Sequence, residues 1–191
     1  TLAIYTPDGA PWDKARDALT AMASLTGREA EGVGLLARID ASIAAARERI
    51  GGAPRPPVLL VNFMDKRHVR IYGPGSIFGA VLERLGLTNA YTGWASFWGF
   101  ATLGVEHLAT SGNAQLFMFE PVPEEVRASF AERPLWQALP FVREGRVASL
   151  PAVWSFGGMM SAERFARVLS EKLTSGGATS ADVRSGGVRH E

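Results

Sequence analysis

One long helical stretch dominates the sequence. It runs from Thr26 to Ile50 with only isolated glycines, and it stops at the Gly-Gly-Ala-Pro sequence of residues 51–54. Apolar residues recur along it at helical spacing, which predicts one helix of roughly 24 residues, about 36 Å long. Such a helix is long for a small α/β domain and is typical of a strut between two bodies. Its first residues, Thr-Gly-Arg-Glu at 26–29, predict a capping box.

The segments on either side of this stretch alternate between strand and helix patterns. A strand is predicted at Thr1–Tyr5 and a helix from Pro11 to Leu25. After the long helix, strands are predicted at 57–63, 69–72, 115–119 and 146–150, helices at 77–85, 124–131 and 161–173, and helical turns at 105–109 and 135–138. Buried strands alternating with helices favour an α/β fold with a mostly parallel sheet. The last residues, 174–191, lack an apolar face and are expected to form a flexible tail.

Composition excludes several classes of protein. Hydrophobic residues make up 47% of the chain and charged residues 20%, which allows a buried core. Basic residues number 20 against 19 acidic ones and are scattered, so no nucleic-acid-binding patch is expected. The absence of cysteine excludes disulfides, thiolate metal sites and a cysteine nucleophile. No apolar run is long enough to span a membrane, and no signal peptide is recognisable at the start of the sequence.

A glycine-rich segment at residues 73–79 invites comparison with a dinucleotide-binding loop. The third glycine of that motif would fall on Phe78, and no acidic residue suited to a ribose follows. A tight turn with Ser76 as the helix N-cap is therefore the better interpretation.

Motifs of common enzymes and metal sites are also missing. The sequence has no nucleophile elbow, zinc-protease motif or phosphate loop. Its three histidines, His68, His107 and His190, have no second ligand at metal-binding spacing. His68 belongs to a charged cluster typical of a solvated hairpin tip. We therefore expect no metal ion bound by the protein.

Two short motifs combine tryptophan, phenylalanine, serine and glycine, one at residues 95–100 and the other at 153–158. A single tryptophan of this kind is more often a loop residue tucked onto the core. Two similar motifs instead favour a shared aromatic wall, because tryptophan offers a large rigid contact area at low entropic cost. The candidate ligand-binding residues are Ser96, Phe97, Trp98, Trp154, Ser155 and Phe156. The two serines could add hydroxyl groups to the wall.

Glu106 stands near the start of a predicted helical turn. Most such acids are solvated and stabilise the helix dipole by about 0.3–1 kcal/mol. The functional alternative is an exposed carboxylate that docks onto a partner.

From Asp13 to about Leu173 the sequence resembles the periplasmic iron-siderophore-binding proteins of bacterial ABC importers. The resemblance is strongest to the ferric-hydroxamate (ferrichrome-type) branch. It is carried by residues 72–78, 85–90, 96–99, 103–109, 134–143 and 151–154. Each segment is a weak signal alone, and they are specific in combination.

This resemblance implies the helical-backbone (class III) fold of that family, with two α/β lobes bridged by one long helix and a ligand cleft between them. Residues 1–25 would then be a remnant of the amino-terminal lobe, 26–52 the interlobe helix and 53–173 the carboxy-terminal lobe. That lobe is expected to be Rossmann-like, with three layers and a mostly parallel sheet. Most of the amino-terminal lobe would be absent from this sequence.

The resemblance also assigns roles to single residues. Trp98 and Trp154 match the family's cleft tryptophans, and Ser96 stands where a polar contact is common. Phe156 falls where hydroxamate binders often have a tyrosine, so it keeps the ring and loses a hydroxyl donor. Glu106 matches the carboxylate that, one in each lobe, meets arginines of the membrane permease.

The function implied is that of a non-enzymatic substrate-binding subunit for ferric-hydroxamate uptake. The siderophore holds the iron with its own oxygens, so the protein needs no cofactor or metal ligand of its own. The implied partners are the ferric siderophore and an ABC importer permease, and the protein is expected to be a periplasmic monomer, soluble or lipid-anchored. The long helix should limit closure of the cleft. Three alternatives remain: the same fold binding cobalamin or haem, a small α/β enzyme using Glu106 and His107, and a fragment that binds little by itself and serves only as one lobe.

Overall fold

The computed structural model describes residue 5 and residues 10–175. The helices are α1 (Pro11–Leu25), α2 (Glu29–Ile50), α3 (Ile77–Arg84), α4 (Glu124–Glu132), α5 (Pro134–Ala138), α6 (Pro140–Arg143) and α7 (Gly158–Thr174), with a 3₁₀ helix η1 (Val105–Ser111). The strands are β1 (Val58–Phe63), β2 (His68–Tyr72), β3 (Phe100–Gly104), β4 (Gln115–Phe119) and β5 (Val147–Leu150). The strand expected at Thr1–Tyr5, apart from Tyr5 itself, and the tail from residue 176 onward lie outside the described residues.

The five strands form one sheet in the order β3-β2-β1-β4-β5. β1, β4 and β5 pair in parallel, and β2 pairs antiparallel with both β1 and β3. β2 is therefore the one strand of this sheet that runs against the others, which confirms the mostly parallel sheet predicted from the sequence. The central position of β1 explains its continuous apolar run, because both faces of the strand are covered and residues 58–61 are at most 1% exposed.

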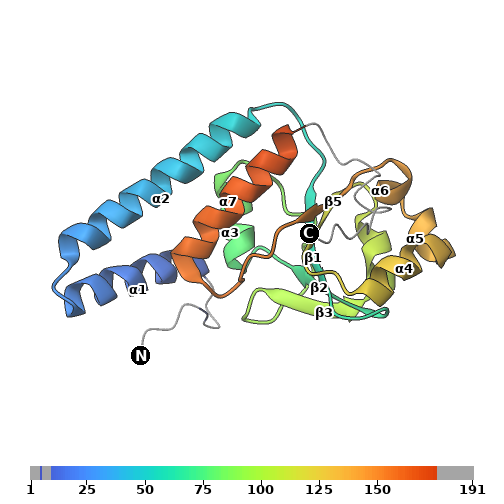
Figure 1. Ribbon diagram of the computed structural model, residues 1–191, viewed down its shortest axis with the longest axis horizontal. Helices are drawn as coiled ribbons and strands as arrows, with labels where there is room; N and C mark the ends of the chain where they lie inside the picture. Colours follow the sequence, from blue (N-terminus) through green and yellow to red (C-terminus); the bar gives the residue numbers. More distant parts are fainter. Residues whose placement is uncertain (1–4, 6–9, 176–191) are drawn as a thin grey trace, which may run out of the picture.

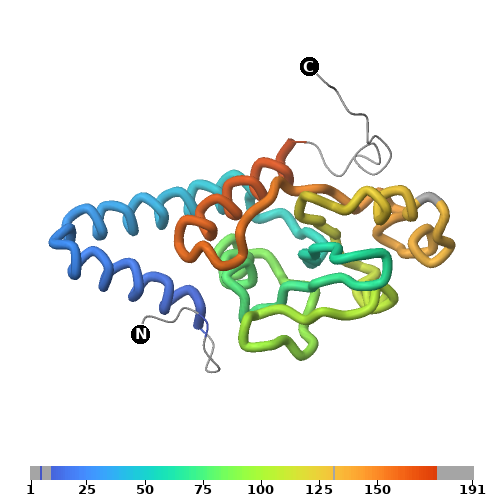
Figure 2. Tube along the Cα trace, turned by 60° about the horizontal axis from the view of Figure 1, so that its bottom comes forward, coloured from blue at the N-terminus to red at the C-terminus, as the bar shows by residue number. Residues whose placement is uncertain are grey.

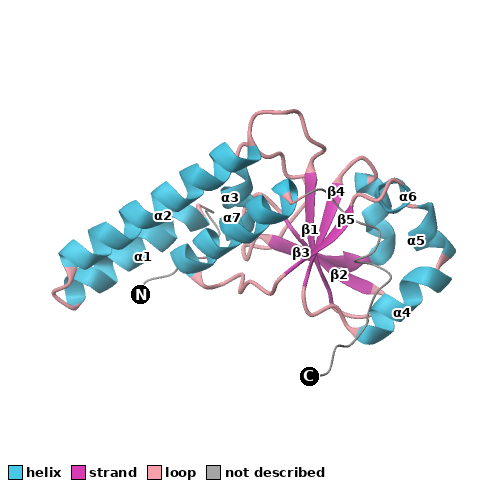
Figure 3. Ribbon diagram, turned by 45° about the horizontal axis from the view of Figure 1, so that its top comes forward, coloured by secondary structure: helices cyan, strands magenta, loops and turns pink. Residues whose placement is uncertain are grey.

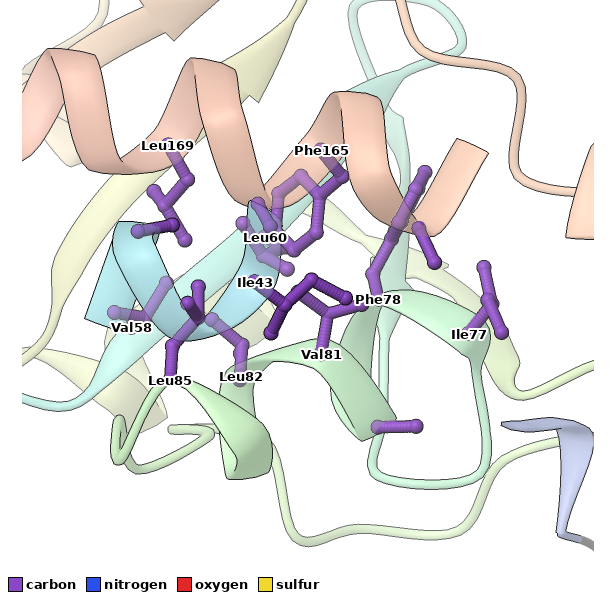
Figure 4. Close-up of a cluster of buried hydrophobic side chains, with 14 of the residues drawn as sticks. Ile43, Val58, Leu60, Ile77, Phe78, Val81, Leu82, Leu85, Phe165 and Leu169 are labelled. Atoms are coloured by element: carbon purple, nitrogen blue, oxygen red, sulfur yellow. The ribbon is translucent and has the colours of Figure 1, made fainter. Parts of the chain in front are cut away.

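Helices cover both faces of the sheet, so the expected three layers are present. Figure 3 shows α1, α2, α3 and α7 on one side of the strands and α4, α5 and α6 on the other. The first layer is held together by a cluster that includes Phe78 of α3, Phe165 of α7 and Leu60 of β1, all fully buried (Figure 4). Burial of such large side chains supplies most of the free energy that holds the helices on the sheet.

The predicted long helix is present as α2, which has 22 residues and a length of about 33 Å. It lies beside α7 and forms an antiparallel pair with α1, and this pair extends away from the sheet (Figures 1 and 2). α1 approaches closely because residue 32 is glycine: a Cβ there would lie 2.5 Å from the Cβ of Ala23. The ion pair between Arg16 and Asp40, 2.7 Å long, adds a surface link between the two helices.

The capping box predicted at the start of α2 is wrong. The hydroxyl of Thr26 donates to the carbonyl oxygen of Met22, 2.8 Å away, and so serves the end of α1. Arg28 is the N-cap of α2 and makes no capping hydrogen bond with its side chain. The reason is the short connection at residues 26–28, in which Gly27 has a φ of 66° and turns the chain back at once.

Two other boundaries differ from the prediction. Strand β3 begins at the last residue of the first tryptophan motif, where no strand was predicted. This short edge strand has glycines around it, and only one of its five residues is fully buried. Helix α7 begins at Gly158 and not at Ser161. Within residues 5 and 10–175, no helix is both long and apolar enough to cross a bilayer.

Candidate functional site

The first tryptophan motif is a tight turn from Ser96 to Gly99. The amide of Gly99 donates to the carbonyl of Ser96 at 2.8 Å, and the hydroxyl of Ser96 donates to the carbonyl of Phe100, also at 2.8 Å. Phe97 and Trp98 occupy the corner of this turn. Their rings lie 4.5 Å apart, so the turn presents two adjoining aromatic side chains.

Glycine is needed at the end of this turn. Gly99 has a φ of 80°, and a Cβ there would lie 2.3 Å from the amide nitrogen of Ser76. Its carbonyl also accepts a hydrogen bond from the amide of Gly73, 2.9 Å away. The tryptophan turn is thereby fixed against the segment that leads into α3.

That segment is the tight turn predicted at residues 73–79, and the N-cap at Ser76 is confirmed. The hydroxyl of Ser76 donates to the carbonyl of Gly73 at 2.7 Å and accepts from the amide of Gly79 at 2.9 Å. Ser76 is 2% exposed, so this pair of bonds is shielded from water. The start of α3 is therefore a rigid support for the turn that carries Trp98.

The second tryptophan motif is a similar turn, from Trp154 to Gly157, between β5 and α7. The amide of Gly157 donates to the carbonyl of Trp154, 3.3 Å away. Trp154 is 70% exposed, while Ser155 is buried. Trp154 therefore points outward, while buried Ser155 packs the turn against the rest of the protein.

The two turns meet through Phe156. Its ring centre lies 5.5 Å from the ring of Trp98, at an interplanar angle of 78°, and 6.4 Å from the ring of Phe100. Trp98 and Phe97 are 42% and 50% exposed. We call Phe97, Trp98, Trp154 and Phe156 the aromatic surface. The structure thus brings Phe97, Trp98 and Phe156 together, while Trp154 projects into solvent from the same turn as Phe156. A single wall that includes Trp154 stays a prediction.

The two predicted serines have structural partners. The Ser96 proton is used inside its own turn, so this hydroxyl can offer a ligand only an acceptor. Ser155 is 8% exposed, and its carbonyl accepts a hydrogen bond from the hydroxyl of Tyr5, 2.5 Å away. A direct ligand contact of either serine stays a prediction.

Tyr5 is a member of this group that the sequence interpretation missed. Its ring lies 5.8 Å from that of Trp98 and 5.3 Å from that of Phe156. Burial raises the pKa of its phenol to about 12, so the hydroxyl remains a donor at neutral pH. Nothing near Tyr5 in the sequence resembles the tryptophan motifs; its place at the end of an apolar run, just before a turn, was the only local signal.

Glu106 lies beyond the opposite end of β3, in the first turn of η1. Its side chain is 64% exposed, and one carboxylate oxygen lies 3.6 Å from Nδ1 of His107. The carboxylate folds back over residue 104, where only glycine leaves room for it. Buried Leu108 anchors η1 to the core. Glu106 is thus an exposed acid held on a short rigid element, apart from the aromatic surface.

A small apolar pocket on the other side of the sheet is lined by residues of the β1–β2 turn, η1, α4 and α5, and Trp136 is among them. None of the predicted site residues lines it. Among the described residues, no three histidine or acidic side chains lie together as a potential metal site.

The model of the periplasmic binding protein family matches residues 3–153. Among curated proteins, the iron(3+)-hydroxamate-binding protein FhuD of Escherichia coli K12 is 34% identical over 163 residues, which cover 85% of this chain and 55% of that protein. This chain spans about half the length of the curated relatives it matches.

Solved structures show the same relationship. The Fe³⁺–Desferal-bound siderophore-binding protein FhuD from Vibrio cholerae aligns with a TM-score of 0.78 and 29% identity, over 86% of this chain and 62% of that one. The periplasmic haem-binding protein BhuT, in complex with two haems, aligns with a TM-score of 0.62 and 26% identity, over 84% of this chain and 63% of that one.

Proposed function

Because the chain belongs to the periplasmic binding protein family, we propose that it is part of the substrate-binding subunit of an ABC importer. Proteins of this family bind substrates and are not enzymes. The subunit binds a ferric hydroxamate siderophore at the aromatic surface and delivers it to the membrane permease for iron uptake. It works in the periplasm, as a soluble or lipid-anchored monomer.

The aromatic surface is the observation that carries this proposal. Three of its side chains, Phe97, Trp98 and Trp154, are at least 42% exposed although they are large and apolar. A ferric hydroxamate presents an apolar shell because its oxygens are turned inward onto the iron. Rigid rings can pack against that shell without touching the metal. The ligand therefore brings its own metal coordination, and the protein supplies shape and apolar contact.

Exposed apolar residues on the α1–α2 pair are evidence that a second lobe packs there and forms the other wall of the ligand cleft. Met22, Leu25 and Val33, near the turn that joins the two helices, are 54%, 83% and 68% exposed. An apolar cluster of this kind marks a surface that packs against another body. We propose that α2 is the interlobe helix, that residues 53–173 form one lobe, and that the ligand lies between this lobe and the second.

Haem or cobalamin is the second candidate ligand, because both are flat or rigid bodies that stack on aromatic rings and because BhuT binds haem on the same fold. Calorimetric titration of the intact protein with ferric Desferal, haem and cobalamin separates these functions. We expect micromolar or tighter affinity for ferric Desferal and at least tenfold weaker binding of the other two. Tight binding of haem or cobalamin alone would reject the hydroxamate assignment.

Glu106 is proposed as the residue that docks onto the permease. Replacing it by lysine is expected to lower siderophore uptake by about tenfold, because a charge-assisted contact with a permease arginine becomes a repulsion. Binding of the siderophore to the purified protein should not change. The measurement is transport of ⁵⁵Fe-labelled siderophore into vesicles that hold the cognate importer.

Glu125, an exposed acid on α4, provides the matched control. Glu125→Lys changes the net charge by the same amount and should leave uptake within twofold of the unaltered protein. Equal uptake for the Glu106 and Glu125 variants would remove the docking role from Glu106.

A further inference from the structure

An arginine adjoins the aromatic surface on the same face of the sheet. Arg70 lies in β2, opposite Asn62 of β1 and Thr102 of β3. Its guanidinium carbon is 4.1 Å from the ring centre of Phe100, and Phe100 in turn contacts Phe156. The cation is therefore separated from the aromatic surface by a single phenylalanine ring.

The guanidinium group of Arg70 lacks a polar partner. Its Nε is buried and donates to no neighbour, and the group makes no hydrogen bond or ion pair with any residue that the structure describes. The Oδ1 of Asn62, on the adjacent strand, is likewise buried and unpaired. Five arginines among the described residues have a carboxylate partner, for example Arg127 with Glu120 and Arg146 with Glu144. A half-buried cation without such a partner lowers the stability of the free protein.

Packing against Phe100 does not account for an arginine at position 70. Leucine or methionine would cover the same ring without the desolvation of a charge. The contact does hold the guanidinium plane in a defined place, and a pre-organised fork of donors is suited to a carboxylate. Arg70 is only half-buried, and of its three guanidinium nitrogens only Nε is among the buried unpaired atoms, so the terminal nitrogens retain contact with solvent.

We propose that Arg70 contacts an anionic group of the ligand, so that the site prefers ferric chelates that carry a free carboxylate over neutral chelates of the same size. This inference rests on the proposed function, because it assumes that the chelate lies on the aromatic surface. Asn62 Oδ1 then accepts a hydrogen bond from a donor group of the ligand. The occupied site thereby satisfies polar atoms that are unpaired in the free protein.

The test uses three forms of one ferric complex, that of desferrioxamine. The free terminal amine carries a positive charge, acetylation makes the chelate neutral, and succinylation gives it a carboxylate, while the iron shell stays the same. We expect the succinylated complex to bind the intact protein about 10- to 100-fold more tightly than the acetylated one, as measured by calorimetry. The Arg70→Met variant should bind the two with equal affinity, and Arg70→Lys should keep part of the preference.

Arg84 is the matched control, because its guanidinium carbon lies 3.9 Å from the ring centre of Trp12 and the described rings show no contact between Trp12 and the aromatic surface. Arg84→Met removes the same charge and the same type of ring contact, and should leave the preference intact. Two results would overturn the proposal: equal binding of the three complexes by the unaltered protein, or an equal loss for all three in Arg70→Met, which would make Arg70 a structural residue. If none of the three complexes binds, the proposed siderophore-binding function is rejected as well. Equal binding of the three would reject only the role of Arg70.

Discussion

Replacing both Trp98 and Trp154 by alanine is expected to lower the affinity for a ferric hydroxamate by about a thousandfold. Each exposed ring can contribute about 2 kcal/mol to binding, as tryptophans at the centre of interfaces do, and this corresponds to roughly 30-fold per residue. The two residues are 42% and 70% exposed and neither belongs to the buried core, so their removal should leave the fold intact. Calorimetric titration of the intact protein measures the affinity, and thermal unfolding verifies the fold.

Trp94 offers a control of the same residue type in the same loop. It is 79% exposed, and the described rings include none within stacking distance of it. Trp94→Ala should change the affinity by less than threefold. A double variant of Trp98 and Trp154 that still binds as tightly as Trp94→Ala would show that the ligand lies elsewhere.

The second large effect is expected for Gly99→Ala, which should lower the free energy of unfolding by about 2–4 kcal/mol and weaken ligand binding at the same time. The φ of 80° at this position is unfavourable for alanine, and the added Cβ would lie 2.3 Å from the backbone of Ser76. Since both obstacles are backbone atoms or backbone angles, they cannot be relieved by a side-chain rotation. The turn that carries Trp98 must move away from α3. Urea unfolding gives the stability and calorimetry gives the affinity.

Gly75 belongs to the segment that faces Gly99 and is the matched control. A Cβ at Gly75 would come no closer than 3.8 Å to its nearest neighbour, an ordinary contact, and its φ is not positive. Gly75→Ala should therefore change the stability by less than 1 kcal/mol. Equal effects of the two substitutions would mean that the close approach of Gly99 to α3 does not position the turn.

The sequence was most informative where one pattern alone decides the structure. The continuous apolar run of β1 and the long periodic stretch of α2 were both predicted, because burial on two faces and helical spacing leave direct marks in the sequence. Strand β3 was not predicted, because five residues at a sheet edge form a strand only by pairing with β2. The role predicted for Thr26 was also wrong. A hydroxyl between two helices can form a hydrogen bond with the end of the first or the start of the second, and the sharp turn at Gly27 decides which.

The candidate site shows the same limit. Trp98 and Trp154 could be predicted because each lies in a recognisable motif. Tyr5 and Arg70 could not, because their importance comes from contacts with residues far along the chain. In the sequence, nothing distinguishes Arg70 from an ordinary polar residue of a strand. Only the register of β1 and β2, and the ring of Phe100, show that its charge lies beside the aromatic surface without a partner.

The indole NH resonances of the tryptophans test the central claim most directly. The diamagnetic gallium complex of Desferal is titrated into the intact, ¹⁵N-labelled protein, and the indole signals are followed by NMR. We expect the signals of Trp98 and Trp154 to shift in proportion to saturation, while those of buried Trp12 and Trp136 stay in place. Unchanged signals from Trp98 and Trp154 at saturation would contradict the central claim.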